Sequence, residues 1–182
     1  TVSPRGNFRR IHSGDVKVYE RTDAPGRAWL VHAATLAVDD AAALAALADP
    51  AFDPRARAVL SDIATLPMSS ASPSDAALPG EAVTIAAYTA EQVALRADVA
   101  APALLILADT FYPGWQATVD GAPVPVLRAN LMFRAIALPA GQHDVVLTYR
   151  PASWQQGSLI SLLTLGGLLV VLAASFYRRP VL

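Results

Sequence analysis

Two short stretches of the sequence place aromatic rings beside polar and charged side chains. The first reads DTFYPGW from Asp109 to Trp115, and the second reads RANLMFR from Arg128 to Arg134. Aromatic faces can stack on the C–H faces of sugars, while neighbouring polar groups hydrogen-bond to hydroxyl or phosphate oxygens. The two stretches therefore supply the candidate residues for binding a glycan or a lipid headgroup: Asp109, Tyr112, Trp115, Arg128, Asn130 and Arg134.

An architectural interpretation of the same residues stays open. In this interpretation the aromatic rings fill the core, and one of the two arginines forms an ion pair with Asp109 or with Asp120. Buried rings pack and buried charges are paired in any globular domain. The residue types alone therefore do not separate binding from architecture.

No combination of residues indicates catalysis or metal binding. The three histidines are far apart in the sequence, no H-x-x-x-H pair exists, and cysteine is absent. The sequence has no P-loop, no G-x-G-x-x-G and no G-x-S-x-G motif. Its formal net charge of −1 lacks the positive excess of a nucleic-acid-binding protein. We therefore expect no catalytic residue, no metal, no cofactor and no nucleic-acid partner.

The apolar residues are concentrated near the end of the chain. Charged residues make up 16% of the sequence, against about 25% in a typical soluble protein. No charged residue lies between 151 and 177, and the 20 residues 158–177 would span roughly 30 Å as a helix. This pattern predicts a transmembrane helix over 154–177 rather than a buried core helix, with Trp154 and Tyr177 at the membrane interfaces.

The charges beside this segment predict its orientation. Arg178 and Arg179 follow it directly and, by the positive-inside rule, mark the cytoplasmic end. We therefore expect residues 1–150 to be exocytoplasmic and residues 178–182 to form a short cytoplasmic tail. The sequence carries no export signal, so we expect a fragment of a larger membrane protein. Gly166-Gly167 would allow another membrane helix to approach closely.

The elements that must position the candidate residues are mostly short strands. Apolar and polar residues alternate in 93–99, 115–119 and 145–149, which is the period of a half-buried strand. The uniformly apolar run 103–108 predicts a central strand covered on both faces, and Asp120-Gly121 predicts a type I′ hairpin turn. Residues 81–151 are therefore predicted to form an antiparallel β-sandwich.

The upstream part of the chain is less regular. Residues 1–66 indicate a mixed α/β segment with strands near 15–20, 28–32 and 56–60. Asp39 or Asp40 can cap a helix over 41–48. Residues 67–80 are rich in Pro, Ser and Ala, which is typical of a loop or linker. The predicted fold class is thus mainly β with some α, followed by one C-terminal transmembrane helix.

The stretch Leu107–Pro151 closely resembles the C-terminal part of bacterial YfhO-type membrane proteins. Shorter upstream segments, at 18–20, 28–32 and 47–50, also resemble that family. The resemblance rests on motifs in the family's order: D-x-x-Y-P-G-W at 109–115, V-D-G at 119–121, R-A-N-x-x-F-R-A at 128–135, L-P-A-G-x-H at 138–143, and Y-x-P at 149–151.

The resemblance implies a polytopic glycosyltransferase of the GT-C type in the bacterial plasma membrane. Such an enzyme would transfer a sugar from a polyprenyl-phosphate donor to a cell-envelope acceptor on the outer face of the membrane. Its catalytic acidic residue is expected in an early loop that this sequence does not contain, so this fragment is expected to be non-catalytic. Its implied partners are the bilayer, other transmembrane helices, and a polyprenyl-phosphate sugar or envelope glycan.

Two alternatives from other classes of protein stay open. The chain could be an envelope glycan-binding module, or a single-span structural or accessory subunit of a larger membrane complex.

Overall fold

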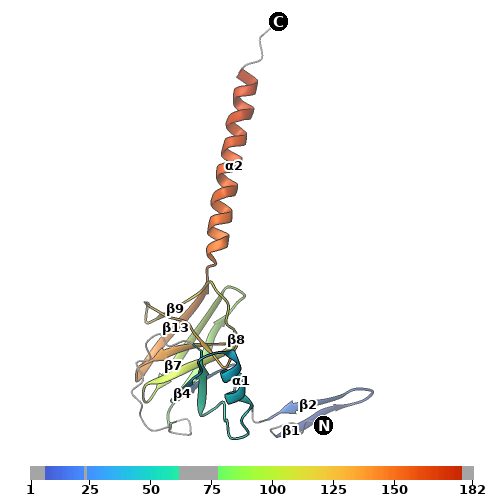
Figure 1. The fold of residues 1–182 in the computed structure, drawn as a ribbon, viewed down its shortest axis with the longest axis vertical. Coiled ribbons are helices and arrows are strands. Elements are labelled where there is room, and N and C mark those ends of the chain that lie inside the picture. Colours follow the sequence, from blue (N-terminus) through green and yellow to red (C-terminus); the bar gives the residue numbers. More distant parts are fainter. Residues whose placement is uncertain (1–6, 23, 62–77, 178–182) are drawn as a thin grey trace.

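The computed structural model describes residues 7–22, 24–61 and 78–177 of the 182-residue chain. These residues form a projecting hairpin, a β-sandwich with one short helix, and a long C-terminal helix (Figure 1). The long helix leaves one end of the sandwich, and the hairpin projects sideways near the opposite end (Figure 1). The mainly β fold class predicted from the sequence is confirmed.

One sheet of the sandwich has five strands. They are β6 (Ala82–Tyr88), β7 (Gln92–Val99), β9 (Trp115–Val119), β10 (Ala122–Val124) and β13 (Gly141–Tyr149). Their order is β10–β9–β13–β7–β6, and every neighbouring pair is antiparallel. β13 is therefore the central strand, paired with β7 from Gly141 to Thr148 and with β9 from Val145 to Tyr149.

The other sheet has six strands. They are β3 (Ala28–Val31), β4 (Ala33–Leu36), β5 (Arg57–Leu60), β8 (Ala103–Thr110), β11 (Leu127–Ala129) and β12 (Phe133–Leu138). Their order is β3–β8–β12–β11–β5–β4. This sheet combines upstream strands with strands of the predicted sandwich, so segments 1–66 and 81–151 share one fold. Residues 67–77 of the predicted linker lie outside the described residues.

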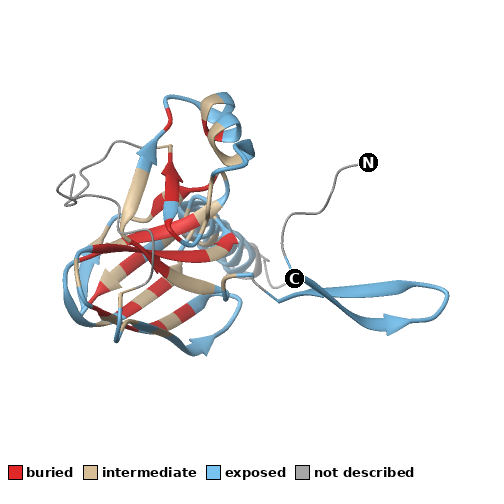
Figure 2. Ribbon diagram, turned by 90° about the horizontal axis from the view of Figure 1, so that it is seen from below, coloured by how far each residue is buried: buried red, intermediate tan, exposed pale blue. Residues whose placement is uncertain are grey.

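The core lies between the two sheets and follows the alternation in the sequence. Leu95 of β7 and Leu147 of β13 pack in one cluster with Leu105 of β8 and Ile136 of β12. The intervening β8 residues, such as Ile106, are buried in a second cluster on the other face of the six-stranded sheet. Buried positions accordingly continue along the middle strands of both sheets (Figure 2). The prediction of a strand at 103–108 covered on both faces is confirmed.

A short helix, α1 (Asp40–Ala48), connects β4 to β5. Asp39 is its N-cap, with the Ala42 N–H donating to the Asp39 carboxylate at 2.7 Å. Because the chain returns through a helix, β4 and β5 pair in parallel. This parallel pair lies within the segment 1–66, for which the sequence predicts mixed α/β structure.

The Asp120-Gly121 turn has the predicted geometry. Val119 pairs with Ala122, so the loop between β9 and β10 has two residues. Asp120 has a φ of +52° and Gly121 a φ of +82°. Positive φ at both positions defines a type I′ turn, which matches the twist of the two strands.

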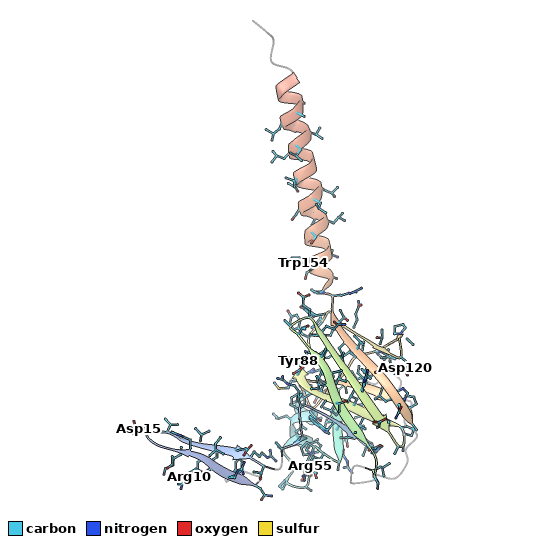
Figure 3. All side chains as sticks on the ribbon, turned by 180° about the vertical axis from the view of Figure 1, so that it is seen from behind. Arg10, Asp15, Arg55, Tyr88, Asp120 and Trp154 are labelled. Atoms are coloured by element: carbon cyan, nitrogen blue, oxygen red, sulfur yellow. The ribbon has the colours of Figure 1, made fainter. Side chains whose placement is uncertain are left out.

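The hairpin consists of β1 (Phe8–Ser13) and β2 (Lys17–Arg21), and both strands are exposed along their whole length. An Arg9–Glu20 ion pair of 2.6 Å joins them. Figure 3 shows the hairpin residues Arg10 and Asp15 far from Trp154, which lies at the base of the long helix.

The long helix, α2 (Ala152–Tyr177), has 26 residues and extends about 39 Å at 1.5 Å per residue. Its segment Ala152–Ala174 is long and apolar enough to cross a membrane, and none of it is buried against the rest of the protein. Large apolar side chains from Leu159 to Leu172 are exposed on all sides. The alternative of a buried core helix is therefore wrong.

Candidate functional site

The Y-P-G-W turn at 112–115 lies directly against the start of α2. The Arg150 N–H donates to the Gly114 carbonyl at 2.7 Å. Gly114 has a φ of +110°, and a Cβ atom there would lie 3.0 Å from the Cα of Pro151. Only glycine allows this backbone approach. The first candidate stretch therefore joins the sandwich to its C-terminal helix.

Three aromatic rings surround this junction. The ring of Tyr149, at the end of β13, lies 5.3 Å from that of Trp115 and 6.4 Å from that of Tyr112. Tyr112 is 60% exposed, whereas Trp115 and Tyr149 are half-buried. Tyr112 is thus the ring of this cluster that a ligand can most readily reach.

Arg134 lies behind Trp115, inside the end of the sandwich. Its guanidinium carbon is 3.7 Å from the centre of a Trp115 ring, and its Nε donates to the Thr110 carbonyl at 3.0 Å. The residue is only 6% exposed, and its Nη1 is buried with no hydrogen-bond partner among the described residues. Burial lowers the pKa of Arg134, although the nearby Asp109 carboxylate opposes that effect.

Asp109 is buried beside these residues and is held by two others. The Tyr88 hydroxyl donates to one Asp109 oxygen at 3.0 Å, and Arg27 pairs with the other at 3.4 Å. The Arg27 guanidinium also lies 4.6 Å from the centre of the Tyr88 ring. Burial and the hydrogen bond to Asp109 raise the pKa of Tyr88. At the helix end of the sandwich, the buried Asp109 carboxylate therefore lies among two guanidinium groups and several rings.

The other two candidate residues of the second stretch, Arg128 and Asn130, have different neighbours. Arg128 pairs with Asp40 at the start of α1 at 3.0 Å, and its Nε donates to the Leu131 carbonyl. The buried Asn130 accepts a hydrogen bond from the Val59 N–H at 2.8 Å and donates its own N–H to the Val59 carbonyl. These contacts hold the β11–β12 turn against α1 and β5.

The structure thus divides the candidate residues into two groups. Asp109, Tyr112, Trp115 and Arg134 lie together at the helix end, whereas Arg128 and Asn130 contact α1 and β5. The ion pairs considered in the architectural interpretation are not formed, since Arg128 pairs with Asp40 and Asp109 with Arg27. The assignment of all six residues to ligand binding stays a prediction.

A groove of about 430 Å³ opens beside the same junction. It runs from the turn between β6 and β7 to the first turn of α2. Its walls are formed by Glu91, Thr148, Tyr149, Arg150, Pro151 and Trp154. We call it the juxtamembrane groove. Trp154, predicted at the membrane interface, is 75% exposed here. The side chain of Tyr177, together with Arg178 and Arg179, lies outside the described part of the structure.

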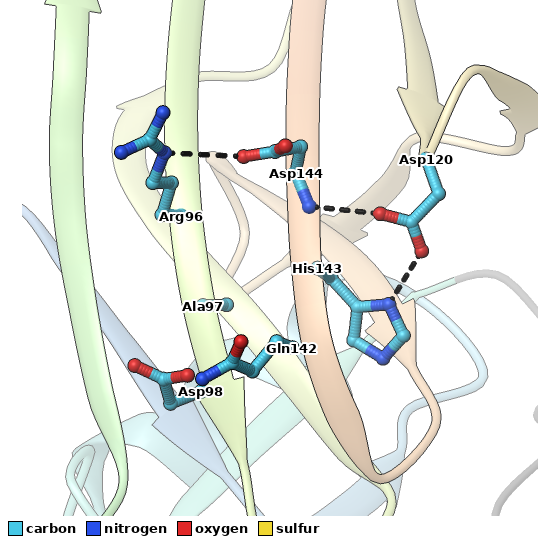
Figure 4. Close-up of a pocket in the computed structure, with 7 residues that line it drawn as sticks. All are labelled: Arg96, Ala97, Asp98, Asp120, Gln142, His143 and Asp144. Carbon is cyan, nitrogen blue, oxygen red and sulfur yellow. Dashed lines mark hydrogen bonds and ion pairs between the residues drawn. The ribbon is translucent and has the colours of Figure 1, made fainter.

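A second hollow, of about 450 Å³, lies on the outer face of the five-stranded sheet, away from α2 (Figure 4). His143 contacts Asp120 at 2.7 Å, and Asp144 donates its N–H to Asp120 and pairs with Arg96. The hydrogen bond from His143 is the main cause that lowers the pKa of Asp120. Most polar groups of this hollow therefore bind one another. Among the described residues, no group of three or more acidic or histidine side chains is placed to hold a metal ion.

Sequence reasoning missed several residues of the helix end. Arg27 and Tyr88 are separated from Asp109 by many residues, and only the sheet order brings them together. Glu91 and Arg150 are single charges at strand ends, with no local motif around them. The one available signal was Tyr149, which belongs to the Y-x-P motif that precedes the helix.

Fold and site together define a class of protein. It is an extramembrane β-sandwich joined, through the rings of Tyr112, Trp115 and Tyr149, to an apolar helix of membrane-spanning length. The family model for the bacterial membrane protein YfhO matches residues 64–161, which is more than half of the chain. The chain belongs to this family. No curated protein and no solved structure matches it. The matched range contains the whole segment from β6 to the start of α2 and omits β1–β5 and α1.

Proposed function

We propose that this chain is the C-terminal extramembrane domain and last membrane helix of a larger GT-C-type glycosyltransferase. The enzyme uses a polyprenyl-phosphate-linked sugar to glycosylate a cell-envelope acceptor. Within it, the sandwich does not catalyse transfer but positions the acceptor or the sugar at the membrane surface.

One observation carries this proposal. The first candidate motif, Asp109–Trp115, packs against Tyr149–Pro151 where α2 begins. A lipid-linked donor presents its phosphate and sugar at that same level, just outside the hydrocarbon core. The exposed Tyr112 ring and the indole of Trp115 offer stacking surfaces there.

The orientation is part of the proposal. By the positive-inside rule, Arg178 and Arg179 favour a cytoplasmic end for α2, which would leave the sandwich outside. A reporter fused after Leu182 is then protected from protease added to intact cells. Cleavage of that reporter from outside would refute this orientation.

The transferase proposal is tested in membranes that contain the full-length protein to which this chain belongs. Transfer of labelled sugar from a polyprenyl-phosphate donor to envelope polymer is measured for the natural protein, for a deletion of residues 27–150, and for Tyr112→Ala. We expect the deletion to abolish transfer and Tyr112→Ala to raise the acceptor concentration needed for half-maximal rate. The matched control Tyr19→Ala, an exposed ring on the distant hairpin, leaves transfer unchanged.

Transfer that is equal with and without the full-length protein would remove the transferase proposal. The alternative of a structural subunit is favoured by the hairpin, which exposes Phe8, Ile11 and Tyr19 on an arm that projects from the sandwich (Figure 1). That alternative predicts copurification with unrelated membrane proteins at fixed stoichiometry.

A further inference from the structure

We propose that the juxtamembrane groove binds the headgroup of phosphatidylethanolamine. In this proposal Arg150 contacts the lipid phosphate, and Glu91 accepts hydrogen bonds from the ethanolamine ammonium group. The proposal is independent of glycosyl transfer and requires only that α2 crosses a bilayer.

The groove lies at the correct depth. The 20-residue stretch 158–177 that would span the hydrocarbon core begins at Ser158, and Trp154 precedes it by four residues, or about 6 Å along the helix. The polar layer outside each face of the hydrocarbon core is about 5–8 Å thick. Trp154 lies at the base of the long helix (Figure 3), so on this depth Trp154 and the groove that it borders would be level with the lipid headgroups.

Both charges of the groove are available. Among the described residues, neither the Glu91 carboxylate nor the Arg150 guanidinium has an ion-pair or side-chain hydrogen-bond partner. Both residues are exposed. In the same sheet, Arg96 and Asp144 instead pair with each other at 3.3 Å. The groove thus offers one negative and one positive charge, from Glu91 and Arg150. A zwitterionic headgroup has one charge of each sign and can pair with both.

The walls of the groove are firmly placed. The Tyr149 N–H donates to the Glu91 carbonyl at 2.8 Å, which fixes the β6–β7 turn against β13. The Thr89 hydroxyl accepts a hydrogen bond from the Gln92 N–H at 3.0 Å and tightens the same turn. Glu91 and Arg150 are therefore held on neighbouring strands, and the groove needs no rearrangement to form.

The chemistry distinguishes ethanolamine from other common headgroups. A primary ammonium offers three N–H donors to Glu91 and also interacts favourably with the rings of Tyr149 and Trp154. Choline has no N–H to donate, and an anionic glycerol headgroup would have no cation for the Glu91 carboxylate. The geometry thus points to ethanolamine rather than choline or glycerol.

The experiment uses the full chain in nanodiscs of phosphatidylcholine mixed with phosphatidylethanolamine or phosphatidylglycerol. Lipids retained after mild detergent extraction are quantified by native mass spectrometry. We expect ethanolamine lipid to be enriched about threefold or more over both other lipids, the ratio expected for one exposed charge-assisted contact.

Two variants identify the contacts. Glu91→Gln is expected to remove the preference for ethanolamine lipid over glycerol lipid, and Arg150→Gln to lower retention of both. The matched controls Glu20→Gln and Arg96→Gln change the same charges outside the groove and leave retention unchanged. Equal retention of all three lipids, a preference for phosphatidylglycerol, or an unchanged preference in Glu91→Gln would overturn the proposal.

Discussion

The guanidinium carbon of Arg134 lies 3.7 Å from the ring centre of Trp115, and the two residues belong to opposite sheets of the sandwich. Arg134 extends from β12 and Trp115 from β9, so the contact closes the gap between the sheets at the end where α2 begins. A cation over an indole face is attracted by the ring quadrupole, and the attraction strengthens when water is excluded. The pair thus replaces the apolar packing that fills the rest of the core.

Substitution of Trp115 by alanine should destabilise the sandwich. The change removes a half-buried ring, leaves a cavity, and uncovers a guanidinium that already lacks one hydrogen-bond partner. We expect a loss of about 2–3 kcal/mol in the free energy of unfolding, somewhat below the range for fully buried tryptophans. Denaturant unfolding of the two proteins measures the difference. The neighbouring exposed Gln116→Ala should change it by less than about 0.5 kcal/mol.

Gly114→Ala should disturb the junction with α2. The added methyl group would contact the Pro151 Cα at 3.0 Å and Tyr149 Cε2 at 3.1 Å, at a φ that disfavours side chains. We expect the free energy of unfolding to fall by at least about 2 kcal/mol and proteolysis near residue 150 to become faster.

Gly121→Ala is the matched control for this change. Gly121 also has a positive φ, but its Cβ would have no neighbour within 4 Å. The free energy of unfolding of Gly121→Ala should fall by only about 1 kcal/mol, the cost of the left-handed backbone conformation for a residue with a side chain. Equal losses in the two variants would show that the contact with Pro151 does not matter.

Asn130 should tolerate aspartate better than alanine. Its side-chain oxygen accepts the buried Val59 N–H, and its φ is +49°. Alanine leaves that N–H unpaired and keeps the strained backbone, for a combined loss of about 2–4 kcal/mol. Asn130→Gly should lose less stability than Asn130→Ala because glycine adopts a positive φ without strain. Asn130→Asp should lose less again because its carboxylate still accepts the Val59 N–H. Thermal unfolding ranks the three variants, and a rank in which alanine is best would contradict the assignment.

The Glu81 carboxylate should make the fold sensitive to acid. Burial acts to raise its pKa, but hydrogen bonds from His32, Ala100 and Leu78 outweigh burial and hold the pKa below its ordinary value of 4.5. A lowered pKa adds stability above about pH 4.5, and this stability is lost as the pH falls through the folded-state pKa. Unfolding at a series of pH values between 3 and 7 should reveal the loss.

The variant Glu81→Gln should weaken this acid dependence. It should also be less stable than the natural protein near neutral pH, because His32 loses its buried ionic partner. The control Glu20→Gln breaks only an exposed pair in the hairpin and should preserve the natural pH profile.

Local signals predicted the elements of this fold better than their arrangement. The apolar run of β8, the Asp39 cap and the Asp120-Gly121 turn each depend on neighbours in the sequence, and all three are found. The pairing of β3 with β8 joins Leu30 to Leu105, and no local pattern specifies such a distant partner. The sequence pattern therefore indicates a segment distinct from the sandwich over residues 1–66, although strands β3, β4 and β5 of that segment belong to the six-stranded sheet.

The same reason limits prediction of the site. Composition identified the rings and arginines of both motifs, but their partners lie far away in the sequence. The hydrogen bond between Arg128 and Asp40 spans 88 residues, and Tyr88 reaches Asp109 across the ends of two sheets. The residue types were therefore visible, whereas the division of the motif residues between two locations required the sheet order.

The close approach of Gly114 to Pro151 gives the protein a mechanical property. Because β13 continues into α2 through a junction packed by Gly114 and Tyr149, the strand and the helix have little freedom to swivel independently. The nine residues of β13 extend about 30 Å from the membrane end of the sandwich. A change of about 20° in the tilt of α2, within the range seen for membrane helices, would displace the far end of β13 by about 10 Å. A small change in the tilt of α2 within the bilayer would therefore move the turns at the far end of the sandwich by a much larger distance than the junction itself.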